Sequence, residues 1–282
     1  MLKRILIPLD TSEYTTAAIR MAAHIALRSS ENGRPAVNLA GMGIIDLDQI
    51  PSGRFASMVN REKLIADATS ETAKLVEDFN KKVLESGVNK AQVESLMVQG
   101  SPFRGIIRES VFSDIIVMGE KCSFPPVNQD YDTMHHLYHE SSRPIVLTDA
   151  NFNEVETVLL VMDGTAPASR MLYTYMQLNP FPKARVVLAW SEREAKEYGL
   201  DEFFARARSS LEDHGFDVSM LSYSGEFEKD IPALVKKEKA GMVAIGVHRD
   251  QMLNRLTDPF HIRGNMAMRL LNEISGSLFL VN

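Results

Sequence analysis

The chain has 282 residues, 45% of them hydrophobic and 24% charged, and its formal net charge is −6. This acidic balance, with no basic run, argues against a nucleic-acid-binding surface. A single cysteine, Cys122, excludes an intrachain disulfide and fits a reducing compartment. No segment approaches the roughly 20 apolar residues of a membrane span, and the first apolar stretch ends at Asp10, too early for a signal peptide. We therefore expect a cytoplasmic protein without a membrane partner.

The first half predicts alternating strands and helices. Continuous apolar runs predict strands buried on both faces, and apolar residues at helical spacing predict one-sided helices. Strands are expected near 3–9, 36–41, 92–98, 114–119 and 144–148, and helices over 18–25, 61–86, from 102 onward and over 131–141. Residues 46–60 contain Pro51 and Gly53 and little periodicity, so we expect a long loop there.

The second half predicts the same alternation in a shorter form. Strands are expected near 156–162, 184–190, 217–223, 242–247 and 277–281, and helices near 166–178, 194–214, 228–239 and 263–274. Strands that alternate with helices imply parallel pairing, with the helices on both faces of the sheet.

The two halves repeat one pattern. An apolar strand ends in Asp10-Thr-Ser in the first half and in Asp163-Gly-Thr in the second, and a later strand ends in Gly119 and in Gly246. The first copy is longer by about 25 residues, most of which we place within 46–70. We expect two domains, 1–150 and 151–282.

The predicted fold class is α/β, with two tandem doubly wound domains, each a mostly parallel five-stranded sheet with helices on both faces. Such sheets bind ligands beyond the carboxyl ends of their strands, at the point where the strand order reverses. Asp10, Gly119, Asp163 and Gly246 all lie at such strand ends. A ligand site is therefore expected at this edge in either half.

These features resemble the universal stress protein family in its tandem two-domain form. The resemblance covers nearly the whole chain and is carried by the opening strand with Asp10-Thr-Ser, Gly100-Ser-Pro, the strand ending at Gly119, Asp163-Gly-Thr and Gly264-Asn-Met-Ala. It implies that the last strands, 144–147 and 278–281, pair with each other to give an intrachain pseudo-dimer. A homodimer is also open.

Nucleotide-binding members of that family carry the signature Gly, two residues, Gly, nine residues, Gly, then Ser or Thr. Its glycines let backbone N–H groups approach phosphate. The resemblance implies the following nucleotide-binding candidates: Asp10, Thr11, Gly119 and Thr133 in the first half, and Asp163, Gly164, Gly246, Arg249, Gly264 and Asn265 in the second.

Both halves depart from this signature. In the first, Cys122 replaces the second glycine and Asp132 the third. In the second, Arg249 replaces the second glycine, and Gly264 lies five residues beyond the position of the third glycine of the signature. Arg249 could hold phosphate through its side chain or be a surface arginine. Of the two halves, the second keeps more of the features that favour phosphate binding.

The run around His135 and His139 offers a metal hypothesis. These histidines are four apart, so on a helix they share a face, and Cys122 could join them as a ligand. The alternative is a solvated polar face. A metal- or redox-responsive protein, resting on Cys122 and these histidines, is the third and last of our functional hypotheses.

The leading hypothesis is a cytoplasmic stress-response protein that binds an adenine nucleotide, ATP or AMP, and signals by conformation. The alternative is a degenerate scaffold that has lost nucleotide binding and acts through unidentified protein partners. No acid, base and nucleophile set can be assembled from the sequence, so at most slow ATP hydrolysis is expected.

Overall fold

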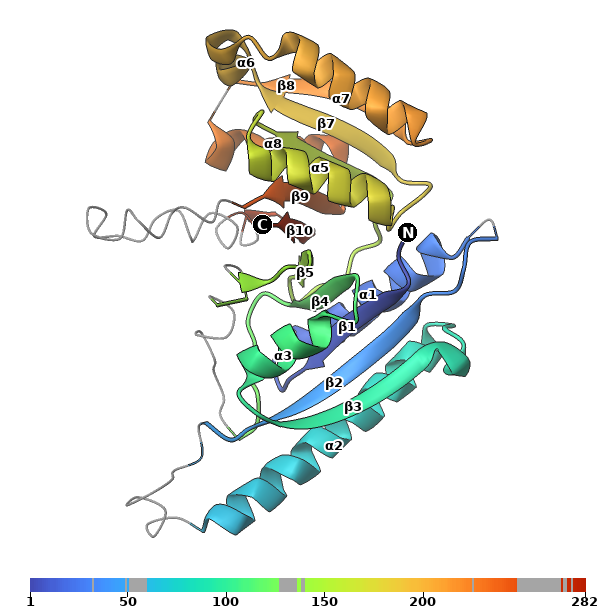
Figure 1. The fold of residues 1–282 in the computed structure, drawn as a ribbon, viewed down its shortest axis with the longest axis vertical. Helices are drawn as coiled ribbons and strands as arrows, with labels where there is room; N and C mark the ends of the chain where they lie inside the picture. The colour runs from blue at the N-terminus through green and yellow to red at the C-terminus, as the bar shows by residue number, and fades with distance from the viewer. Residues whose placement is uncertain are drawn as a thin grey trace, which may run out of the picture. The chain divides into compact units, whose positions relative to one another are not determined.

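The computed structural model describes residues 1–31, 33–48, 50, 60–126, 136–137, 140–224, 226–247, 270, 273–274 and 276–282. Strands and helices alternate in a mixed α/β fold with mostly parallel strands (Figure 1). Contacts divide the chain into two compact units, Leu2–Arg143 and Pro144–Asn282 together with Met1. In the described residues, no helix is both long enough and apolar enough to cross a membrane.

The first unit is a parallel sheet with helices on both faces. Its elements are β1 (Arg4–Leu9), α1 (Thr15–Ser29), β2 (Asn38–Asp46), α2 (Arg61–Glu85), the 3-10 turn η2 (Lys90–Gln92), β3 (Val93–Gly100), α3 (Pro102–Ser110) and β4 (Ile115–Gly119). The strand order is β3-β2-β1-β4, and every pair is parallel. Helices α1 and α2 cover one face and α3 the other (Figure 1). The strand order therefore reverses between β1 and β4.

Two glycines explain how closely α2 packs on this sheet. A β-carbon on Gly41 of β2 would overlap the ring of Phe79, and one on Gly43 would lie 2.6 Å from Cγ2 of Thr72. Phe79 and Thr72 are both fully buried. Helix α2 begins after Asn60, whose side chain accepts a hydrogen bond from the Lys63 backbone N–H at 3.0 Å.

The second unit repeats this plan. Its elements are β5 (Ile145–Thr148), β6 (Thr157–Met162), α5 (Ala166–Leu178), β7 (Arg185–Ser191), α6 (Glu192–Tyr198), α7 (Asp201–Asp213), β8 (Asp217–Tyr223), α8 (Phe227–Glu238), β9 (Met242–Gly246) and β10 (Ser277–Val281). The strand order is β5-β10-β9-β6-β7-β8. Helices α5 and α7 cover one face and α8 the other (Figure 1). Here the order reverses between β6 and β9.

The two last strands pair with each other, as the resemblance implied. β5 and β10 are antiparallel, with Leu147 opposite Leu278 and Val146 opposite Phe279, whereas all other strand pairs described in this unit are parallel. All four side chains are fully buried. Their apolar character therefore reflects a shared strand pair rather than a bare edge.

Some boundaries differ from the sequence predictions. The helix expected over 194–214 is two helices, because Gly199 takes a left-handed φ of 64° and ends α6. Strand β2 runs to Asp46, beyond the predicted 36–41. Most of the predicted helices 131–141 and 263–274 lies outside the described residues.

Candidate functional site at the strand ends

In the first unit, the acid that ends β1 is directed into the protein. Asp10 is 2% exposed, and its Oδ1 accepts hydrogen bonds from the Ser12 backbone N–H at 2.6 Å and from Thr15 Oγ1 at 2.9 Å. Burial raises the pKa of Asp10, although the hydrogen bonds from Ser12, Thr15 and the Ser123 backbone oppose that shift. The carboxylate thus organises the turn into α1 and leaves little surface for a ligand.

The segment that follows β4 covers the ends of its neighbours. Ser123 O accepts a hydrogen bond from the Thr11 backbone N–H at 2.9 Å, and Pro125 O accepts one from the Asp46 N–H at 2.7 Å. Phe124, between them, is 1% exposed. The backbone N–H groups of Thr11, just after β1, and of Asp46, at the end of β2, are therefore hydrogen-bonded within the protein. They lie where a ligand of this fold would bind.

Side chains around Gly119 also close this edge. Gly119 packs against Tyr14, because a β-carbon on the glycine would overlap the Tyr14 β-carbon. Lys121 Nζ lies 3.2 Å from the Tyr14 hydroxyl and 5.4 Å from its ring centre, and 3.4 Å from Glu120 Oε1. The Lys121 ammonium, two residues after Gly119, is thus already engaged by an aromatic ring and a carboxylate.

The equivalent acid of the second unit is more accessible. Asp163 follows β6 and is partly exposed, and its Oδ1 accepts hydrogen bonds from the Thr165 N–H at 2.9 Å and hydroxyl at 2.6 Å. Gly164 has a φ of 76°, and a β-carbon there would lie 2.6 Å from Leu200. The positive φ favours glycine, whereas the contact is with the flexible end of the Leu200 side chain, which can shift. Gly164 therefore has a structural role whether or not a ligand binds.

Further acidic groups lie near Asp163. Burial and the charge of Asp163 raise the pKa of Glu194 in α6, whose Oε2 is buried with no hydrogen-bond partner in the described residues. Burial raises the pKa of Tyr223 at the end of β8, with Glu194 and Asp163 adding to it. Asp230 Oδ2 accepts a hydrogen bond from the Ser224 hydroxyl at 2.6 Å. Acidic groups therefore predominate at the edge beside β6, although Arg193 opposes both pKa shifts.

Gly246 ends β9 beside the start of α5. A β-carbon on Gly246 would overlap the backbone of Pro167 and Ala168. Like Gly119, it is explained by close helix packing, so its presence alone is not evidence of phosphate contact.

Several candidates fall outside the description. Thr133, Arg249, Gly264, Asn265, His135 and His139 lie outside the described residues. Cys122 is 4% exposed, and in the described part of the chain no group of three or more His, Cys, Asp or Glu side chains could hold a metal ion.

Glu194 and Tyr223 were missed from the sequence. Topology could have indicated them. Glu194 follows the end of β7 and Tyr223 ends β8, and parallel strands bring such ends to one edge of the sheet.

Comparison with solved structures gives the class of fold. A universal stress protein from Archaeoglobus fulgidus matches at a TM-score of 0.69 and 14% identity, over 99% of this chain and 96% of that one. A functionally unknown protein from Pseudomonas aeruginosa matches at a TM-score of 0.56 and 15% identity, over 99% and 92%. No family model and no curated protein sequence matches this chain. The chain therefore has the fold of a universal stress protein over nearly its whole length.

Proposed function

We propose that this chain is a cytoplasmic, non-enzymatic stress-response protein that binds one adenine nucleotide, through its second unit. The observation that supports it is the contrast between the two strand-end acids. Asp163 is partly exposed at the reversal of strand order, whereas Asp10 is buried beneath its own chain. A ligand of this fold class binds at that reversal.

The charge pattern favours one orientation of the nucleotide. Asp163 and Glu194 make the β6–β7 side acidic, which suits the ribose hydroxyls and adenine amine as hydrogen-bond donors and disfavours phosphate. The phosphates would then lie toward the end of β9, where Arg249 follows in the sequence. The resemblance to nucleotide-binding universal stress proteins implies the same orientation, with the acid that ends the first strand on the adenine or ribose side.

The test is calorimetric titration of the full chain with ATP and with AMP, alongside mass spectrometry of small molecules released from the purified protein. We expect one site per chain. Asp163→Asn should weaken binding about tenfold, through loss of a charge-assisted hydrogen bond. Asp217→Asn is the matched control. Asp217 is exposed at the start of β8, whereas Asp163 follows the carboxyl end of β6, so the two acids lie at opposite ends of these parallel strands.

A second candidate is a scaffold that binds no nucleotide and acts through protein partners. The covered ends of β1 and β2 favour it, because they show one copy of the repeat without an open ligand edge. Absence of both a released nucleotide and binding heat would favour this scaffold over the nucleotide proposal.

A further inference from the structure

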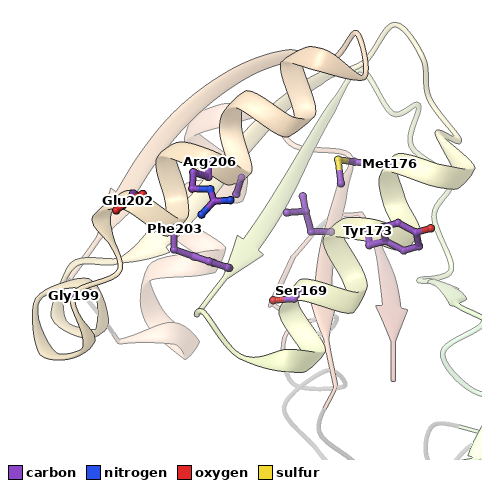
Figure 2. A pocket seen from close by; sticks show the side chains of 9 residues that line it. Ser169, Tyr173, Met176, Gly199, Glu202, Phe203 and Arg206 are labelled. Atoms are coloured by element: carbon purple, nitrogen blue, oxygen red, sulfur yellow. The ribbon is translucent and has the colours of Figure 1, made fainter.

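A groove on the second unit lies between two helices, and its Ser169 and Gly199 end adjoins the turn that follows β6. It runs between α5 and α7 and has a volume of about 650 Å³ (Figure 2). That volume is in the range of small-molecule pockets. Its lining is mainly apolar and includes Leu172, Tyr173 and Met176 from α5 and Phe203 and Ala207 from α7.

Helical spacing sets the length of the groove. The α5 side is formed by Ser169, Leu172, Tyr173 and Met176, which share one helix face. From first to last they span about 10 Å at 1.5 Å per residue. Two helical turns accommodate a short extended molecule, whereas a docked partner helix would need a longer surface.

Arg206 gives the groove a positive pole. In Figure 2 its guanidinium points into the space between the helices, while the Glu202 carboxylate points away from it. Arg206 is exposed and forms no ion pair within the described part of the chain, unlike Arg208, which lies 2.7 Å from Glu212. The groove therefore combines an apolar floor with one cation that forms no ion pair among the described residues, and its lining also includes Glu202.

This combination selects the chemistry of the ligand. A highly polar ligand would find few partners, since the Ser169 hydroxyl already donates to Thr165 O at 3.0 Å. A single arginine matches one carboxylate, which it can hold through two parallel hydrogen bonds. Apolar side chains along the floor match an alkyl chain.

We propose that the α5–α7 groove binds a medium-chain fatty acid, with the carboxylate on Arg206 and the alkyl chain over Leu172, Met176 and Phe203. This proposal does not depend on nucleotide binding, although one end of the groove adjoins the turn that holds Asp163.

The chain contains its own reporter for this test. Trp190, its only tryptophan, stacks on Phe204 with ring centres 5.7 Å apart, and Phe204 contacts Phe203 at 5.5 Å. Decanoate, added below its micelle concentration to the full chain, should change Trp190 fluorescence with one site per chain. Decan-1-ol, which has the same alkyl chain without the charge, should bind more weakly.

Arg206→Gln should weaken decanoate binding about fivefold and leave decan-1-ol binding unchanged, because only the charged hydrogen bonds of an exposed side chain are lost. Arg208→Gln, on the same helix, should change neither. Phe203→Ser should weaken both ligands, with circular dichroism checking that it folds. The proposal is overturned by absence of saturable binding, by many sites per chain, or by equal affinity of decanoate for Arg206→Gln and the unchanged protein.

Discussion

The backbone of Pro167, in the first turn of α5, lies so close to Gly246 that the glycine has no room for a β-carbon. Gly119 stands in the same relation to Tyr14, before α1. Each repeat thus has a glycine, at the end of β4 or of β9, that allows close packing of the start of α1 or of α5.

Gly246→Ala should lower the free energy of unfolding by about 1–3 kcal/mol, because the added carbon meets backbone that must shift. Urea denaturation measures this. Gly105→Ala, within α3, is the control. Its β-carbon would meet the flexible end of Met42 at 3.2 Å and Val98 at an ordinary 3.7 Å, and alanine favours helix by about 0.5–1 kcal/mol. Equal effects of the two substitutions would contradict the packing explanation.

Asp10 should give the stability a characteristic pH dependence. Burial raises its pKa in the folded state, so the folded chain holds this proton more tightly than the unfolded chain does. Its contribution to the free energy of unfolding is therefore lost as pH rises from the ordinary aspartate pKa of about 3.9 through the raised folded value.

The Asp10→Asn variant should not show that decline. Relative to the unchanged protein, its free energy of unfolding should rise across this pH window, as measured by urea denaturation at several pH values. The exposed Asp217→Asn variant should track the unchanged protein at every pH. A gap between Asp10→Asn and the unchanged protein that stays constant with pH would refute the raised pKa.

Tyr175→Phe should stabilise the protein. Tyr175 is fully buried against Phe216 and Phe279, and its hydroxyl has no hydrogen-bond partner among the described residues. Removing an unsatisfied buried hydroxyl should raise the free energy of unfolding by about 1 kcal/mol. The exposed Tyr173→Phe should leave thermal unfolding unchanged. A clear loss of stability in Tyr175→Phe would mean that the hydroxyl has a partner.

Arg4 anchors β1 to its surroundings at the other end of the sheet. Its Nη2 lies 2.8 Å from Glu94 and 2.7 Å from Glu109, and Nη1 donates to Ser113 Oγ at 2.8 Å. Arg4→Met should cost about 1.5–3 kcal/mol, since the charged hydrogen bonds are partly buried. Arg208→Met removes a more exposed pair and should cost below about 1 kcal/mol in the same urea titration. Comparable losses would argue that the Arg4 network adds nothing beyond a surface pair.

The sequence predicted the fold well because this fold is built from local signals. Apolar runs such as the one ending at Asp10 gave the strands, and their alternation with helices gave the parallel sheet. The order of the strands, and with it the place where that order reverses, comes from the structure.

The site was less predictable because its accessibility depends on tertiary paths. Nothing local in the segment after Gly119 reveals that Ser123 and Pro125 bond to the ends of β1 and β2. The helical pattern over 194–214 also hid the break at Gly199, which brings Leu200 against Gly164.

The pairing of β5 with β10 has a practical consequence for dissecting this protein. The repeat suggests a domain boundary between residues 150 and 151. Dividing the chain there would separate β5 from its hydrogen-bonded partner strand, β10. The fragment starting at Asn151 would carry an open, apolar strand edge, which invites self-association. A fragment starting at Pro144, where the compact unit begins, retains β5 and is the natural one for studying the second unit alone.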